Sequence, residues 1–250
     1  CEAPPCKGQL LMPQTAPSPK QPSPPATHVR LRGWLIVSAL LLIVIGAGVF
    51  YYLLRPLDAP IPAGAGSHYQ GLEQGYTSQG FPRLGRADAP VLIEEFSSYA
   101  CPHCREFHEG RFVTLLDAIG AGRVQFVFIP IPNIGWGAGD AAKGALCAGE
   151  QGQFWTMTDV LFDWQRRFLT STFDMRRIRK GAQALGLNMA AFDACLKRDT
   201  VQLVLEQARQ EFTRRGLTGT PSFFINGRKV EDYRELDALV SPQGDDSTAP

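Results

Sequence analysis

The sequence predicts an α/β domain that carries an extra block of helices and is preceded by one membrane-spanning helix. Three observations support this prediction. An uncharged apolar run occupies positions 35–54, and alternating strand and helix patterns begin near residue 81. Only helical patterns follow in 138–215, before two short strand-like runs close the domain. Such an alternation is typical of strands joined by crossover helices.

Residues 1–33 are predicted to be disordered. The stretch PQTAPSPKQPSPPAT is dense in proline and has few large apolar side chains, so it buries too little surface to offset the entropy of ordering. A rigid proline-rich docking ligand is the alternative. The chain opens with CEAPPCKGQLLM, which leaves Met12 as a candidate for the true start, and we assign no role to Cys1 and Cys6.

Residues 34–54 are predicted to form a transmembrane helix. The segment LIVSALLLIVIGAGVFYYLL has about 20 residues without a charge, enough to span roughly 30 Å of hydrocarbon. Trp34 at one end and Tyr51 and Tyr52 at the other suit the two membrane interfaces. A cleaved signal peptide is the competing interpretation, but the apolar run is long for one and no clear small-residue cleavage site follows.

The charges that flank this helix predict its orientation. Lys20, Arg30 and Arg32 precede it, whereas Arg55 follows it and is soon offset by Asp58. By the positive-inside rule, we expect a single-pass protein of the cell membrane with a cytoplasmic N-terminus. The residues after the helix are then expected outside the cytoplasm, either in the periplasm or on the outer surface. The net charge of +1 gives no attraction to polyanions, so we expect no nucleic-acid partner.

Composition predicts the domain boundaries beyond the membrane. Residues 55–80 are rich in proline, glycine and serine, and are expected to form a flexible linker with a reach of about 25 to 30 Å. The folded domain is expected over 81–240, and the polar tail 241–250 is expected to be disordered.

The domain opens with a β-α-β pattern. VLIEEF (91–96) is a short apolar run, REFHEGRFVTLLDAI has helical spacing, and RVQFVFIPI is rich in β-forming residues. Within the helical block, one apolar stripe has helical spacing and is expected to be core: Phe154, Met157, Leu161 and Trp164.

The ends of elements are also marked. Asn188 is expected to cap a helix that begins with MAAFDACL. The glycine-rich IGWGAGDAAKG lacks a phosphate-binding GK[ST] ending and is expected to lead into a helix capped by Asp140. Asn226-Gly227 in PSFFINGRKV predicts a β-hairpin, and EDYRELDALV a last helix.

The stretch SSYACPHCREF places Cys101 and Cys104 two residues apart. A zinc site would need four ligands, but there is no second CxxC or HxxxH, and only His103 and His108 lie near in sequence, so we expect no metal. A c-type haem would need histidine where Arg105 stands. A structural disulfide across so short a loop would constrain little chain. A redox centre is the remaining interpretation.

The position of the pair predicts its chemistry. Cys101 lies where a strand and loop meet a helix N-terminus, so free backbone N–H groups and the helix dipole stabilise its thiolate. A protonated His103 would add positive charge near the same sulfur. Cys104 is then the resolving sulfur, and Pro102 is tolerated in a first helical turn. Because a stable thiolate favours the reduced pair, the oxidised pair should give its disulfide away.

These motifs resemble a known family. EFSSYACPHCREF, the later GTPSFFING and the helical block between them are similar to the DsbA-like branch of the thioredoxin superfamily, in a membrane-anchored form. The resemblance covers roughly residues 80 to 240. It implies a thioredoxin fold with an inserted helical subdomain, and thiol:disulfide oxidoreductase activity on exported proteins without a cofactor.

The resemblance also assigns roles to residues. It implies that Cys101 is the attacking sulfur and Cys104 its partner. Pro221 would be a cis-proline that faces the pair, and Thr220 would offer backbone hydrogen bonds to a bound peptide. Glu95 matches the buried acid that helps to move the proton of the resolving thiol. Neighbouring Glu94 points to the other face of the strand, so one of the two carboxylates is expected to be solvated.

Cys147 and Cys195 both lie in the helical block. In an oxidising compartment they could be joined, and would then close a loop of about 49 residues worth roughly 4 kcal/mol. The resemblance permits such a second, non-catalytic pair. Two buried free thiols and a redox relay are the alternatives.

The sequence therefore predicts an oxidase that acts on reduced exported proteins and is reoxidised by a membrane partner of the DsbB or VKOR type. A disulfide isomerase or reductase is the alternative within this class. A non-enzymatic thiol chaperone for a metal such as copper is the alternative from another class. We expect a monomer, because no dimerisation segment is evident.

Overall fold

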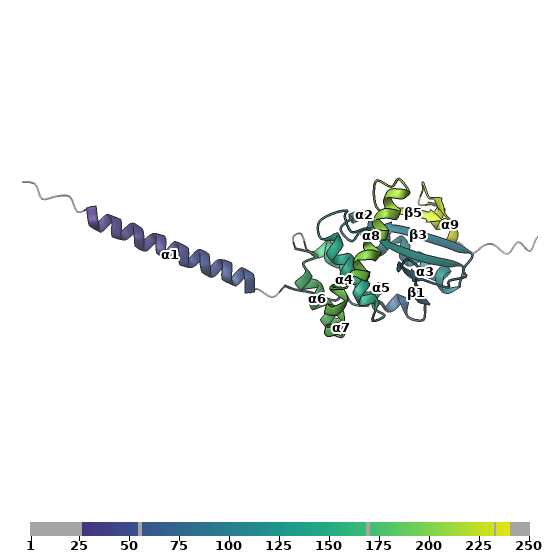
Figure 1. Ribbon diagram of the computed structural model, residues 1–250, viewed down its shortest axis with the longest axis horizontal. Coiled ribbons are helices and arrows are strands. Elements are labelled where there is room, and N and C mark those ends of the chain that lie inside the picture. The colour runs from purple at the N-terminus through teal and green to yellow at the C-terminus, as the bar shows by residue number, and fades with distance from the viewer. Residues whose placement is uncertain (1–26, 55–56, 169–170, 233, 241–250) are drawn as a thin grey trace, which may run out of the picture. The chain divides into compact units, whose positions relative to one another are not determined.

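The computed structural model comprises an N-terminal helix and a folded domain that begins at residue 57 (Figure 1). The predicted disorder of 1–26 and of the tail 241–250 concerns residues outside the described set. The residues that the structure describes are 27–54, 57–168, 171–232 and 234–240.

Helix α1 (Thr27–Leu54) contains the predicted apolar segment. Its stretch Gly33–Tyr51 has a mean hydropathy of 2.5, and by length and composition it could cross a membrane. The prediction of disorder was wrong for 27–33, which are helical. The last proline of the preceding stretch is Pro25, so no proline interrupts the backbone hydrogen bonds of these first turns.

The described part of the domain contains a six-stranded sheet with the order β1-β2-β4-β3-β5-β6. Strands β3 and β4 are parallel, and the other neighbours are antiparallel. The predicted β-α-β unit is confirmed, with its crossover divided into α2 (Pro102–Glu109) and α3 (Arg111–Gly120). The strands are β1 (Gln74–Tyr76), β2 (Pro82–Leu84), β3 (Val91–Ser97), β4 (Val124–Pro130), β5 (Ser222–Ile225) and β6 (Arg228–Lys229).

The predicted hairpin and last helix are also confirmed. Asn226 and Gly227 connect β5 to β6 with φ angles of 49° and 80°, the left-handed conformation that such a two-residue turn requires. Helix α9 (Arg234–Val240) follows the hairpin.

A block of helices separates β4 from β5, as predicted. Figure 1 shows α6 and α7 together at one end of the domain, beside α4 and α5. The predicted apolar stripe on α5 is buried along its whole length. The helices are α4 (Ala138–Gly149), α5 (Phe154–Arg167), α6 (Met175–Ala184), α7 (Met189–Leu196) and α8 (Asp199–Arg214).

The two faces of the sheet bury different cores. On β3, Ile93 belongs to the larger core, which also contains Cys104 and Phe107 of α2. Phe96 points to the opposite face, where it belongs to a smaller core with Ala208 of α8. This alternation decides which β3 side chains lie beneath the cysteine pair.

Of the two predicted helix caps, one is confirmed. The side chain of Asn188 accepts a hydrogen bond of 3.1 Å from the backbone N–H of Ala191. The prediction for Asp140 was wrong, because α4 begins at Ala138 with Gly137 as its N-cap. Asp140 lies instead in the first turn, where a carboxylate favours the helix dipole.

The prediction that 55–80 form a flexible linker was wrong for 57–80, which pack onto the domain. The indole N–H of Trp164 donates to the carbonyl of Pro60 at 2.7 Å, and the Arg177 guanidinium donates to the carbonyl of Asp58 at 2.8 Å. Both donor side chains are buried and need acceptors, which this segment supplies.

A second anchor of the same segment is Tyr69, which is buried in the 3₁₀ turn η1 (Ser67–Tyr69). Its hydroxyl donates to the Asp159 carboxylate at 2.7 Å, and His108 Nε2 lies 2.8 Å from the same oxygen. Strand β1 then joins the sheet edge. Composition missed these contacts because their partners lie far away in the sequence.

Candidate functional site

The two cysteines of the CPHC motif lie at the start of α2. Cys101 is the N-cap residue, with an extended backbone (φ −90°, ψ 120°), and Pro102 occupies the first turn as predicted. Cys101 is half-buried and Cys104 is fully buried one turn further on. One sulfur is therefore accessible to another protein, and the other lies beneath it.

A distant segment completes the surroundings of the pair. Cys101 Sγ lies 3.1 Å from the backbone carbonyl oxygen of Thr220, which accepts a hydrogen bond when the thiol is protonated. The Thr220–Pro221 peptide bond is cis, as predicted. On the inner side, the backbone N–H of Ser98 donates to Cys104 Sγ at 3.4 Å. The fold thus brings the predicted residues of both motifs together.

The two thiols have opposite electrostatic surroundings. Hydrogen bonding from the Cys104 thiol, with smaller contributions from the Thr220 side chain and from the backbone N–H groups of His103 and Cys104, lowers the pKa of Cys101 to about 5. Burial, the contact with Cys101 and the charge of Glu95 raise the pKa of Cys104 well above its usual range. At neutral pH Cys101 is a thiolate and Cys104 keeps its proton.

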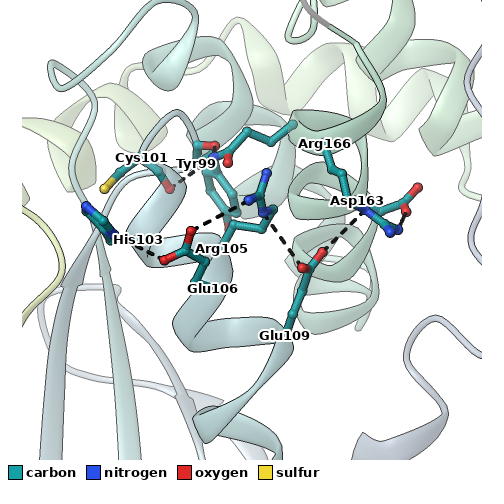
Figure 2. Close-up of polar contacts among 9 residues, drawn as sticks. Tyr99, Cys101, His103, Arg105, Glu106, Glu109, Asp163 and Arg166 are labelled. Carbon is teal, nitrogen blue, oxygen red and sulfur yellow. Dashed lines mark hydrogen bonds and ion pairs between the residues drawn. The ribbon is translucent and has the colours of Figure 1, made fainter. Parts of the chain in front are cut away.

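His103 acts on Cys101 through its backbone. Its ring Nδ1 lies 3.1 Å from the Glu106 carboxylate, and the side chain is 77% exposed (Figure 2). The backbone N–H of His103, at the helix N-terminus, is among the groups that lower the pKa of Cys101. The structure therefore pairs the predicted positive charge of the ring with a carboxylate.

Glu95 lies on the face of β3 that packs under α2, and only 1% of it is exposed. Burial raises the pKa of its carboxyl group to about 8. Neither carboxyl oxygen makes a hydrogen bond among the described residues. The carboxyl group is therefore largely protonated at neutral pH, and free to give its proton to a neighbour.

The expectation that one of the two neighbouring carboxylates is solvated was wrong. Glu94 points to the opposite face of β3, where both of its oxygens accept hydrogen bonds of 2.8 Å from Arg215. Its side chain is only 15% exposed. The arginine lies 121 residues away, so no local pattern could have predicted this pair.

Gln165 contacts the active-site turn and was not predicted from the sequence. Its amide nitrogen donates to the carbonyl of Tyr99 at 2.5 Å and to the carbonyl of Cys101 at 3.0 Å. In the sequence WQRR, nothing distinguishes this residue from a solvated position on a helix. Helix α5 of the inserted block therefore holds the backbone of the cysteine turn.

Ion pairs also connect α2 with α5 (Figure 2). Arg105 lies 3.7 Å from Glu109, and Glu109 lies 4.0 Å from Arg166. Arg166 in turn pairs with Asp163 at 2.8 Å. Such partly exposed pairs contribute little energy individually, but they orient the two helices that surround the cysteine turn.

The loop between β4 and α4 lies beside the same turn. Ser98 Oγ donates to the carbonyl of Ile134 at 2.6 Å. Gly135 has a φ of 86°, and a side chain there would meet the Cβ of Ala100 at 2.5 Å, so only glycine fits. The next residue, Trp136, is 94% exposed. A large apolar side chain is therefore displayed next to the cysteine turn, a second feature that the sequence did not predict.

A cavity of about 490 Å³ lies beside the exposed side of α2. Its lining combines the apolar ring of Phe107 with polar and charged groups. The lining residues are His103, Glu106, Phe107, Gly110 and Arg111.

The two histidines near the cysteine pair contact carboxylates. His103 contacts Glu106, and His108 contacts Asp159. Within the described residues, no group of three or more His, Cys, Asp or Glu side chains is arranged to hold a metal ion.

Cys147 and Cys195 are joined by a disulfide in the structure, with Cα atoms 5.6 Å apart. The bond connects α4 with α7, and both residues are fully buried. It lies within the helical block and is separate from the pair at the start of α2.

Comparisons with known proteins agree with this geometry. A sequence model of a family described as thioredoxin matches residues 77–241. Over 157 residues the chain is 28% identical to the Na(+)/H(+) antiporter NhaA 3 of Salinispora tropica, an alignment that covers 62% of this chain and 23% of the antiporter. Over 175 residues it is 27% identical to a probable disulfide bond formation protein D of Bacillus anthracis, covering 64% of this chain and 76% of that protein.

Among solved structures, oxidised BdbD from Bacillus subtilis is similar in fold, with a TM-score of 0.55 and 20% identity. The superposition covers 68% of this chain and 98% of BdbD. The family match spans more than half of the chain and includes both the CPHC motif and the cis-proline. The chain belongs to the thioredoxin family.

Proposed function

We propose that the domain is a thiol:disulfide oxidoreductase that works as an oxidase, donating a Cys101–Cys104 disulfide to reduced proteins. The observation that carries this proposal is the contrast between the two sulfurs. Cys101 is accessible and has a pKa of about 5, whereas Cys104 is buried and its pKa is raised. An accessible sulfur that is stable as a thiolate is a good target for attack and a good leaving group.

The exchange proceeds in two displacements. A substrate thiolate attacks Cys101 Sγ of the oxidised pair, so that a mixed disulfide forms and Cys104 leaves with the electron pair and takes up a proton. A second substrate thiolate then attacks the substrate sulfur of the mixed disulfide, and Cys101 leaves as a thiolate. Two electrons pass from the substrate to the cysteine pair, and the substrate gains one disulfide.

The stabilised thiolate of Cys101 sets the direction. Whatever stabilises the reduced pair relative to the oxidised pair makes the disulfide a stronger oxidant, by about 30 mV for each 1.4 kcal/mol. The groups that lower the pKa of Cys101 therefore favour the reduced pair, and with it donation of the disulfide.

The surroundings of Cys101 support a peptide as the substrate. Thr220 lies against the attacking sulfur and can offer its backbone groups to an extended chain. Trp136 and the cavity beside α2 offer apolar contacts on nearby surfaces. We infer that the substrates are reduced, incompletely folded proteins, which expose both backbone and apolar side chains.

We also propose a location and a partner. The apolar stretch of α1 and the positive charges before it support a single-pass anchor with a cytoplasmic N-terminus and an extracytoplasmic domain. The substrates would then be exported proteins, and the reduced pair would pass its electrons to a membrane oxidant of the DsbB or VKOR type. The domain would work as a monomer.

The proposal is tested with the full chain in detergent and a reduced test protein that needs a disulfide for activity. We expect Cys101→Ala to abolish oxidation. Given the oxidised test protein instead, Cys104→Ala should accumulate a mixed disulfide, because Cys101 attacks the substrate disulfide and no Cys104 is present to release it. Oxidation that survives Cys101→Ala would refute the proposal. A protein that reshuffles a scrambled substrate but does not oxidise a reduced one would be an isomerase.

A further inference from the structure

A buried hydroxyl next to the cysteine pair makes no hydrogen bond within the part of the chain that the structure describes. Ser97, the last residue of β3, is fully buried, and its Oγ makes no hydrogen bond among the described residues. Leaving a buried polar group unpaired costs about 1–3 kcal/mol. A serine at this position is therefore unfavourable for stability. Its presence needs an explanation other than stability.

The alternation along β3 places Ser97 beneath the cysteine pair. Ser97 projects from the same face of the strand as Glu95 and Ile93. This face packs against the core that contains Cys104. The backbone N–H of the next residue, Ser98, is 3.4 Å from Cys104 Sγ. The end of β3 and the resolving sulfur are thus in direct contact.

Glu95 and Cys104 are the two groups here that exchange protons, and both are shielded from water. Glu95 is 1% exposed and Cys104 0% exposed, and the carboxyl oxygens of Glu95 also have no hydrogen-bond partner among the described residues. Burial raises the pKa of each group, and the Ser97 hydroxyl acts against that rise in both. The hydroxyl therefore lies near both the acid and the thiol, although in this structure it forms no hydrogen bond with either.

We propose that Ser97 relays the proton between Glu95 and Cys104. The inference rests on the proposed disulfide exchange and adds a catalytic residue to it. A hydroxyl can accept one proton while it donates another, which neither a methyl group nor a backbone carbonyl can do. Ser97 lies on the strand that carries the acid and at the end that contacts the sulfur, the position that such a relay needs.

The proton balance follows from the two displacements. When a substrate thiolate opens the disulfide, Cys104 leaves as a buried thiolate. Ser97 gives its hydroxyl proton to Cys104 Sγ and takes the proton of the Glu95 carboxyl group. One S–H bond forms, one carboxyl O–H bond breaks, and the serine is unchanged. The steps reverse when Cys104 attacks the mixed disulfide formed with the reoxidant.

A relay and a merely structural serine predict opposite effects on stability. Because the hydroxyl makes no hydrogen bond, Ser97→Ala should leave the free energy of unfolding unchanged or raise it. Thr158 is the matched control, since its buried hydroxyl lies 2.8 Å from the Tyr99 hydroxyl and donates to the Phe154 carbonyl at 2.9 Å. Thr158→Val should lower the free energy of unfolding.

The test follows both half-reactions of the full chain in detergent by stopped-flow tryptophan fluorescence. Reduction by a dithiol peptide and reoxidation by oxidised glutathione are measured for the wild type, Ser97→Ala, Ser97→Thr, Glu95→Gln and the Glu95→Gln/Ser97→Ala double variant. We expect Ser97→Ala to slow both steps on the order of 100-fold, and Ser97→Thr to restore them. The double variant should be no slower than Glu95→Gln alone.

Alkylation of Cys101 in the reduced protein shows whether the site is intact, and its rate should be unchanged in Ser97→Ala. Exchange at the wild-type rate in Ser97→Ala, multiplying effects in the double variant, or a loss of stability together with slower Cys101 alkylation would each overturn the relay. Failure of the proposed function is distinct from these outcomes, because the wild type itself would then transfer no disulfide to the peptide.

Discussion

The sulfur of Cys101 lies 3.1 Å from the carbonyl oxygen of Thr220, a residue 119 positions later in the chain. This contact joins the start of α2 to the segment just before β5, so the attacking sulfur and the backbone edge at Thr220 share one surface. A peptide that pairs with this edge would present its own sulfur to Cys101. The arrangement explains why two short motifs at opposite ends of the domain belong to one site.

The low pKa of Cys101 predicts how the stability of the reduced protein depends on pH. The folded pKa of about 5 is below the ordinary value of about 8.5, so the thiolate stabilises the fold fully above pH 8.5 and loses this contribution as the pH falls to 5. We expect the free energy of unfolding of reduced wild type, minus that of Cys101→Ser, to rise between pH 5 and 8.5.

Urea unfolding of both reduced proteins at several pH values measures this difference. Most other titrating groups are common to the two proteins and largely cancel. A difference that stays flat from pH 5 to 8.5 would show that the Cys101 thiol titrates normally.

Gln165 is expected to position the cysteine turn. Gln165→Ala removes the donor to the carbonyls of Tyr99 and Cys101, so the turn should hold Cys101 less firmly at the helix N-terminus. We expect the pKa of Cys101, measured by its alkylation rate against pH, to rise above about 5. Gln165→Glu has the same shape but no donor and should raise it further. An unchanged alkylation profile in both variants would contradict this role.

The disulfide between Cys147 and Cys195 is expected to be structural. The double variant Cys147→Ala/Cys195→Ala should lose about 4 kcal/mol of unfolding free energy, because the bond closes a long loop. Oxidation of the test protein should continue at the wild-type rate under conditions where the variant is folded. Loss of oxidation in a folded double variant would instead indicate that this pair takes part in electron transfer.

Trp136 is expected to contact substrates. Its side chain is 94% exposed, so Trp136→Ala should not change thermal stability. We expect KM for a reduced, unfolded protein to rise on the order of 10-fold, as for an aromatic anchor of an interface. The rate with glutathione, which offers few apolar contacts, serves as the control. An equal loss with both thiols would place the effect on the cysteine pair itself.

Local sequence patterns predicted those features that depend on neighbouring residues. The CPHC motif at a helix start, the Asn226-Gly227 hairpin and the apolar stripe of α5 all follow from spacing and turn chemistry. The neighbouring carboxylates Glu94 and Glu95 show what local patterns cannot predict. Alternation predicts that Glu94 and Glu95 point to opposite faces, but the partner of Glu94 is Arg215, which only the tertiary fold brings near.

The contacts of segment 57–80 and of Gln165 were also not predictable from local sequence patterns. Proline, glycine and serine in the segment indicate a flexible coil, yet its carbonyl groups accept hydrogen bonds from the buried donors Trp164 and Arg177. The sequence indicates a surface position for Gln165, because its contact with the cysteine turn depends on how α5 packs. These features depend on donors and acceptors that meet only after folding, which composition and periodicity do not encode.

The reduction potential of the Cys101/Cys104 couple tests the central claim most directly. It is measured by equilibrating the full chain in detergent with glutathione buffers and following the fraction oxidised. An oxidase that stabilises its Cys101 thiolate should have a potential clearly more positive than about −180 mV, the value of a disulfide isomerase. A potential at or below about −200 mV would contradict the account and indicate a reductase or isomerase.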